Sequence, residues 1–171
     1  YLLKSPGDLL FDLFTVFNKV GKEVCEGQQF DMNFETSDTV NLEQYLEMIR
    51  LKTAVLIGGS MHVGAIIARV TVEKSNLVYD FGENIGMAFQ LQDDLLDAYG
   101  DSHIFGKKTG GDIRSNKKTF LYLKALEMAN MEDKAVLMKH YSSYPANEQE
   151  KVDEVIQIFN KYNISALTRE L

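Results

Sequence analysis

The chain has 171 residues, of which 45% are hydrophobic and 25% charged, and its formal net charge is −7. This length suits one domain with a substantial core, and the negative charge argues against nucleic acid or an anionic membrane surface as a partner. Cys25 is the one cysteine, and the most apolar run, Ala54 to Ala68, is broken by Ser60 and His62 and is too short to span a bilayer. We therefore expect a soluble, cytoplasmic protein without disulfides or stable membrane insertion.

The first third of the chain predicts two helices. A helix start at Ser5 is followed by an apolar pattern of helical spacing that extends to about Cys25. A polar connection over residues 35–40 separates it from the second helix. Asn41 is the predicted cap of that helix, because Gln44 stands three residues later as a capping-box partner.

The middle of the chain predicts the centre of a helical bundle. Residues Ala54 to Val72 are mostly hydrophobic, and small residues such as Gly58 would let neighbouring helices approach closely. A further helix is expected to begin at Ser75 or Asn76 and to continue to about Tyr99.

The last third predicts a glycine-rich loop followed by short helices. The loop covers residues 100–116, and helical patterns follow over 117–131, 134–141 and 147–162, with the opening of another helix after 163. With two prolines and few alternating β-branched runs, the whole sequence predicts an all-α fold of six to eight helices. We expect residues 1–171 to form a single domain.

The helix that ends near Tyr99 carries an acidic face. At about 100° per residue, Gly86, Gln90, Asp93, Asp94 and Asp97 share one arc of the helix, and apolar residues flank it. Carboxylates crowded on an apolar helix repel each other and resist loss of water unless a cation neutralises them. Oxygen ligands without His or Cys favour Mg²⁺, whereas the simpler alternative is a solvated acidic surface.

Basic residues gather directly after this helix, although the protein as a whole is acidic. Five of the 18 basic residues lie within positions 106–118, among several glycines: Lys107, Lys108, Arg114, Lys117 and Lys118. Glycines permit tight turns, and lysines on such a loop can reach a phosphate group. Carboxylates on the helix and lysines on the loop together predict a site for a metal-bound diphosphate, and a flexible turn with solvated lysines is the alternative.

These residues resemble the trans-prenyltransferases, also called polyprenyl diphosphate synthases. The resemblance covers roughly Gly27 to Lys118 and rests on four ordered motifs: Gly27-Gln28-x-x-Asp31, Lys52-Thr53, Phe89-Gln90-x-x-Asp93-Asp94-x-x-Asp97, and Gly106-Lys107-x-x-Gly110-x-Asp112 followed by Lys117. The third motif is similar to the second aspartate-rich region of that family. The resemblance implies an isoprenoid-synthase-type helical bundle.

The family resemblance also implies residue roles. Metal binding, by Mg²⁺ or Mn²⁺, would fall to Asp93, Asp94 and Asp97, with Asp93 the direct ligand. The diphosphate of the allylic substrate would be bound by Lys52, Thr53, Gln90, Lys107 and Lys117, and Lys52, Lys107 and Asp93 would act in catalysis. Supporting residues would be Gln28, Asp31 and Phe89. We expect Gly86, on the same helix face, to leave room for a prenyl chain.

The reaction implied by the resemblance is the condensation of an allylic diphosphate with isopentenyl diphosphate into a longer trans-prenyl diphosphate, by a homodimer in isoprenoid biosynthesis. The family also uses a first aspartate-rich motif followed by two arginines, which this sequence lacks. We therefore expect an incomplete bundle, a C-terminal part without the N-terminal helices and the closing helix, inactive alone. The alternatives are a class I terpene cyclase, a non-catalytic prenyltransferase-like subunit and a simple divalent-ion-binding bundle.

Overall fold

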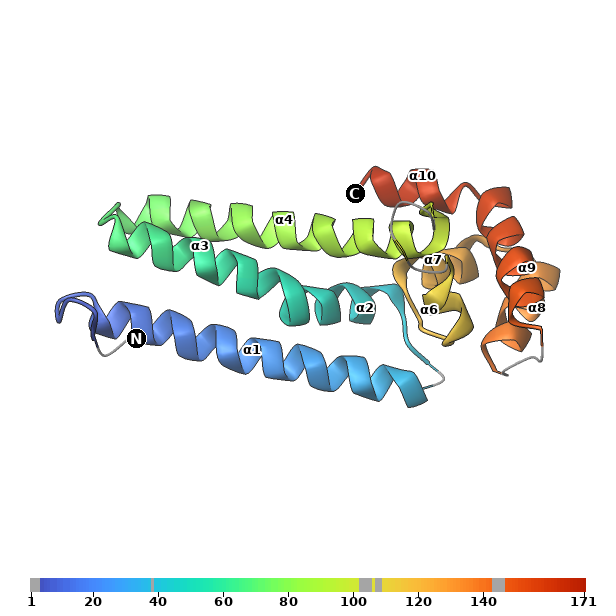
Figure 1. The fold of residues 1–171 in the computed structure, drawn as a ribbon, viewed down its shortest axis with the longest axis horizontal. Coiled ribbons are helices and arrows are strands. Elements are labelled where there is room, and N and C mark those ends of the chain that lie inside the picture. Colours follow the sequence, from blue (N-terminus) through green and yellow to red (C-terminus); the bar gives the residue numbers. More distant parts are fainter. Residues whose placement is uncertain (1–3, 38, 102–105, 107–108, 143–146) are drawn as a thin grey trace. The chain divides into compact units, whose positions relative to one another are not determined.

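A computed structural model describes residues 4–37, 39–101, 106, 109–142 and 147–171, and every element that it assigns among them is a helix (Figure 1). This confirms the expected all-α fold. The chain divides into two compact units, one formed by Tyr1–Asn33 and Leu46–Gln90, the other by Phe34–Tyr45 and Leu91–Leu171. Whether both belong to a single domain stays a prediction. None of the described helices is long and apolar enough to cross a membrane.

The first unit is built around the long helix α1 (Leu10–Thr36). The predicted start at Ser5 is too early, because Leu9 N–H donates to Pro6 C=O at 3.0 Å in a turn that precedes the helix. The predicted end at Cys25 is also wrong, since α1 continues for eleven further residues. Gly27, which would weaken an exposed helix, is buried here because the backbone of Leu51 packs directly against it.

A π-helical turn lies in the first unit where the sequence interrupts its apolar stripe. This turn, η2 (Arg50–Ala54), contains Lys52 and Thr53 and leads into α3 (Val55–Ile67). Wide helical turns of this kind are rare and are often found at functional sites. The wide turn η2 sets the direction in which the side chains of Lys52 and Thr53 leave the helix.

Small residues allow α3 to approach α4 (Val72–Tyr99) closely, as the sequence predicts. A Cβ added to Gly82 would lie 2.8 Å from the Cα of Gly58, and a Cβ on Gly86 would overlap Ala54. The expectation that Gly86 leaves room for a prenyl chain is therefore wrong, because Ala54 fills that space. α4 begins three or four residues before the predicted start and ends at the predicted Tyr99.

The second unit is formed by short helices and the end of α4. The capping box at the start of α2 (Leu42–Ile49) is confirmed, since Asn41 Oδ1 accepts from Gln44 N–H at 2.8 Å and Gln44 Oε1 accepts from Asn41 N–H at 3.0 Å. The remaining helices are α6 (Gly111–Arg114), α7 (Phe120–Met128), α8 (Met131–Tyr141), α9 (Glu148–Lys161) and α10 (Ile164–Arg169). They bury a shared core that includes Phe120, Leu121, Leu137, Val155, Phe159 and Ile164, each at most 2% exposed.

Candidate functional site

Asp97 fixes the segment that follows α4. Its Oδ2 accepts from the backbone N–H of Asp112 at 2.9 Å, and its backbone carbonyl accepts from the N–H of Gly110 at 2.6 Å. Gly110 has a left-handed backbone with φ of 79°, which glycine adopts without strain. The region predicted as an irregular loop therefore contains α6, and this short helix is fastened to the last turn of α4.

Asp112 brings a further acidic side chain to the end of α4, beside those of Asp93, Asp94 and Asp97. Burial raises the pKa of its carboxyl, the Lys117 ammonium at 3.4 Å opposes that change, and the charges of Asp97 and Asp93 raise the pKa further. The sequence placed Asp112 in a motif but gave it no role. Its place in the motif, two residues after Gly110, is the signal that could have identified Asp112 as a site residue.

Asp93 and Asp94 are consecutive in sequence but lie in different environments. Asp93 is exposed, whereas Asp94 is 1% exposed and accepts a hydrogen bond from the hydroxyl of Tyr45. Asp94 Oδ2 also lies 3.4 Å from the backbone nitrogen of Phe120, at the start of α7. Burial and the Asp94 charge raise the pKa of Tyr45 well above its usual range. Sequence reasoning missed this tyrosine because its spacing matches an ordinary core position.

Carboxylates are the kind of ligand that a hard divalent cation prefers, but few of them come together in the part of the chain that the structure describes. Among the described residues, no three His, Cys, Asp or Glu side chains converge closely enough to hold a metal ion by themselves. Mg²⁺ commonly keeps several waters and needs only one or two carboxylates beside substrate phosphates. The exposed Asp93 and the neighbouring Asp97 suit that mode. The contacts of Asp94 favour a structural role, and all three metal assignments stay predictions.

In the first unit, Lys52 is held by Asp31. Lys52 Nζ lies 2.5 Å from Asp31 Oδ2, and the two side chains are 36% and 20% exposed. Gly27, one turn before Asp31, lets α1 touch the η2 backbone, so that this ion pair can form. The motif Gly27-Gln28-x-x-Asp31 thus has a packing explanation. Gln28 itself is exposed, and no contact within the described part of the chain assigns it a role.

The other predicted diphosphate ligands have separate surroundings. Thr53 Oγ1 donates to Gln90 Oε1 at 3.2 Å, next to the exposed Phe89. Lys117 pairs with Asp112, next to the acidic side chains at the end of α4. Lys107 lies outside the described residues, so its predicted role is unchanged.

The polyprenyl synthetase family model matches residues 2–159. The chain belongs to this family. A geranylgeranyl diphosphate synthase of Sulfolobus acidocaldarius is 35% identical over 159 residues, which cover 93% of this chain and 48% of that protein. A short chain isoprenyl diphosphate synthase of Methanothermobacter thermautotrophicus is 39% identical over 82% of this chain and 42% of its own length.

Solved structures agree with this assignment. A crystal structure of a geranylgeranyl pyrophosphate synthase is 44% identical and superposes with a TM-score of 0.91, covering 99% of this chain and 53% of the other. The corresponding enzyme of Pyrococcus horikoshii is 34% identical with a TM-score of 0.90. The expected family and the isoprenoid-synthase-type fold are confirmed. The chain spans about half the length of the relatives that it matches.

Proposed function

We propose that the intact protein is a prenyltransferase that condenses an allylic diphosphate with isopentenyl diphosphate into a longer trans-prenyl diphosphate. The observation that carries this proposal is the group formed by Asp93, Asp97 and Asp112 beside Lys117, within a chain of the polyprenyl synthetase family. Beyond the effect of burial, the charges of Asp97 and Asp93 raise the pKa of Asp112. Negative charges gathered in this way favour a cation between them, and the adjacent lysine favours an anion. A metal-bound diphosphate satisfies both.

Asp93 and Asp97 would hold Mg²⁺, and Mn²⁺ has the same preference for oxygen ligands. When bound, such an ion stabilises the negative charge that develops on a departing diphosphate. Lys117 would donate to the phosphate oxygens while Asp112, 3.4 Å away, orients its ammonium. Asp94 would keep the acidic end of α4 in place through Tyr45 rather than touch the ligand.

The family motifs assign Lys52 to the same diphosphate, and Asp31 supports that role by holding the ammonium at 2.5 Å. A lysine paired with one carboxylate is ordered before the ligand arrives, which reduces the entropy lost on binding. Thr53 and Gln90, joined at 3.2 Å, would line the site in the manner that the motifs predict. Activity as a homodimer stays part of the proposal.

The names of the relatives guide the choice of product. Several are geranylgeranyl diphosphate synthases, and others are geranylfarnesyl or short chain enzymes. We therefore propose geranylgeranyl diphosphate as the first product to test. Extension of dimethylallyl, geranyl and farnesyl diphosphate with labelled isopentenyl diphosphate, followed by separation of products by length, measures this directly.

The same assay tests the acidic group. Asp93→Ala should lower turnover by about 10²-fold or more, because a preorganised electrostatic contact to the developing charge is lost. Asp80→Ala is the matched control, since Asp80 is an exposed aspartate on the same helix, and its turnover should equal that of the wild type. Unchanged turnover of Asp93→Ala would remove Asp93 from the site, and an intact protein without activity would favour a non-catalytic subunit.

A further inference from the structure

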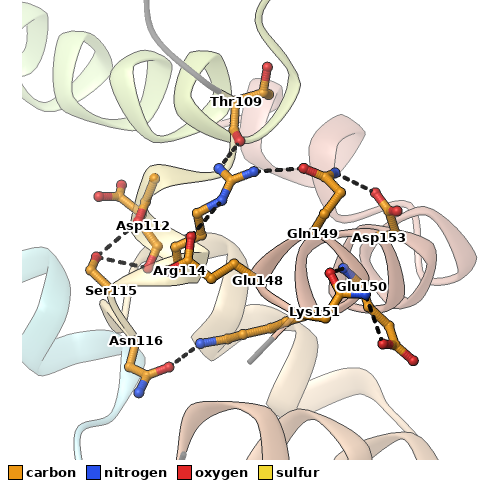
Figure 2. Close-up of polar contacts among 12 residues, drawn as sticks. Thr109, Asp112, Arg114, Ser115, Asn116, Glu148, Gln149, Glu150, Lys151 and Asp153 are labelled. Carbon is orange, nitrogen blue, oxygen red and sulfur yellow. Dashed lines mark hydrogen bonds and ion pairs between the residues drawn. The ribbon is translucent and has the colours of Figure 1, made fainter. Parts of the chain in front are cut away.

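Helix α9 supports the segment 109–118 at both of its ends (Figure 2). The supporting side chains all come from five consecutive residues, 148–152. They contact three positions of the segment: Gly110, Arg114 and Asn116. None of these α9 residues belongs to a motif of the family resemblance, and the proposed chemistry does not use them.

Lys151 is an unusual residue for its position. It is 1% exposed, and its ammonium donates to Asn116 Oδ1 and lies 5.3 Å from the centre of the Tyr141 ring. Burial of the ammonium lowers the pKa of Lys151. Taking a charge out of water is unfavourable unless hydrogen bonds compensate, so an apolar residue would fill the same space at lower cost. The hydrogen bond to Asn116 Oδ1 is one such compensating contact.

Asn116 controls the direction of Lys117. Its backbone is left-handed, with φ of 58°, a conformation that non-glycine residues seldom adopt. Its N–H donates to Ile113 C=O at 3.2 Å, and the next N–H, of Lys117, donates to Asp112 C=O at 2.9 Å. The backbone conformation of Asn116 therefore fixes the position from which the Lys117 side chain leaves the chain.

The other end of the segment is held by Arg114 and Gly110. Arg114 donates to the carbonyl of Thr109 and, at 2.8 Å, to Gln149 Oε1, and Glu148 lies 3.6 Å from its Nε (Figure 2). Val152 packs on Gly110 so closely that a Cβ there would lie 2.8 Å from Val152 Cγ1. Gly110 is the same residue whose N–H bonds the carbonyl of Asp97.

We propose that Lys151 is a positioning residue for diphosphate binding. Through Asn116 it fixes Lys117 and Asp112, while Gln149 and Val152 hold the start of the same segment, so that α9 keeps the phosphate-contacting lysine in place before the ligand arrives. This inference rests on the proposed function, because it assumes that Lys117 contacts a diphosphate. A preorganised contact binds more tightly than one that must first be ordered.

Calorimetric titration of the intact protein with pyrophosphate in the presence of Mg²⁺ tests this role. Lys151→Met keeps the buried volume and removes the ammonium, and we expect pyrophosphate affinity to fall about tenfold. Lys161→Met is the matched control, because Lys161 lies on the same helix but pairs with Asp133 of α8 rather than with the segment 109–118, so its affinity should be unchanged. In a Lys117→Met background, Lys151→Met should cause no further loss of affinity.

The outcomes separate the inference from the proposed function. Failure of the wild type to bind pyrophosphate with Mg²⁺ would overturn the proposed function. If the wild type binds pyrophosphate and Lys151→Met binds it with the same affinity, only the positioning role is overturned. The same conclusion follows if Lys151→Met lowers the affinity as much in the Lys117→Met background as it does in the wild type. Gln149→Ala decides the matter if Lys151→Met does not fold, because Gln149 is exposed. A loss of affinity of about threefold supports the positioning of the segment 109–118 by α9, and equal affinity contradicts it.

Discussion

Two adjacent aspartates of one motif have opposite surroundings. Asp93 faces outward, whereas Asp94 is buried and joins three helices, through Tyr45 of α2 and the Phe120 backbone at the start of α7. Adjacent residues of a helix point about 100° apart, so of two consecutive aspartates one can face solvent while the other faces the interior. The second aspartate then works as an anchor for the first.

Tyr45→Phe tests this anchor. The substitution keeps the ring, which is 1% exposed, and removes the hydroxyl that donates to Asp94. We expect the free energy of unfolding in urea to fall by about 1–3 kcal/mol, because a buried carboxylate loses a hydrogen-bond partner. Tyr79→Phe is the control, since its hydroxyl makes a long contact of 3.4 Å to Glu83 and should matter much less. Equal effects of the two variants would contradict the anchoring role.

Whether a site residue could be predicted from the sequence depends on how far away in the sequence its partners lie. The acidic face of α4 and the lysines after it follow from local spacing, so the sequence predicts them. The contacts Tyr45 to Asp94 and Asn116 to Lys151 join residues 49 and 35 positions apart. No local pattern marks them, because a tyrosine in an apolar stripe and a lysine among glutamates look like ordinary core and surface residues.

The same division holds for helices. The capping box of Asn41 and Gln44 was predictable because its two hydrogen bonds lie within one turn. The end of α1 was not, because Gly27 lowers helix propensity locally while packing against η2 restores the helix. The π-helical turn at Arg50–Ala54 could not be predicted from the sequence either. It places Lys52 beside Asp31 of α1, a contact that only the folded unit contains.

Gly27→Ala tests the packing between α1 and η2. A Cβ there would lie 2.7 Å from the carbonyl carbon of Leu51, which is backbone and cannot move aside easily. We expect a loss of about 1–3 kcal/mol in unfolding free energy from overpacking. Gly21→Ala is the control on the same helix, since nothing lies within 4 Å of its Cβ, and it should stabilise by about 0.5–1 kcal/mol. Two stabilised variants would mean that the helices do not meet at Gly27.

At the scale of the whole molecule, negative charge dominates. The chain carries 25 acidic and 18 basic residues. Two of the lysines assigned to the diphosphate are already paired with aspartates, Lys52 with Asp31 and Lys117 with Asp112. An incoming anion must therefore compete with those carboxylates for the lysines, and the negative field of the whole protein also repels it. A divalent cation reverses this balance, because it neutralises carboxylates and brings positive charge to the phosphate.

Pyrophosphate should accordingly stabilise the intact protein only together with Mg²⁺. A ligand that binds the folded state alone adds about 2.7 kcal/mol at 100 times its dissociation constant. That gain should raise the midpoint of thermal unfolding by several degrees when both components are present. We expect pyrophosphate with EDTA, or Mg²⁺ with sulfate, to leave the midpoint nearly unchanged. An equal rise with pyrophosphate in EDTA would mean that lysines alone bind the anion, and the carboxylates at the end of α4 would then need a purpose other than holding a metal.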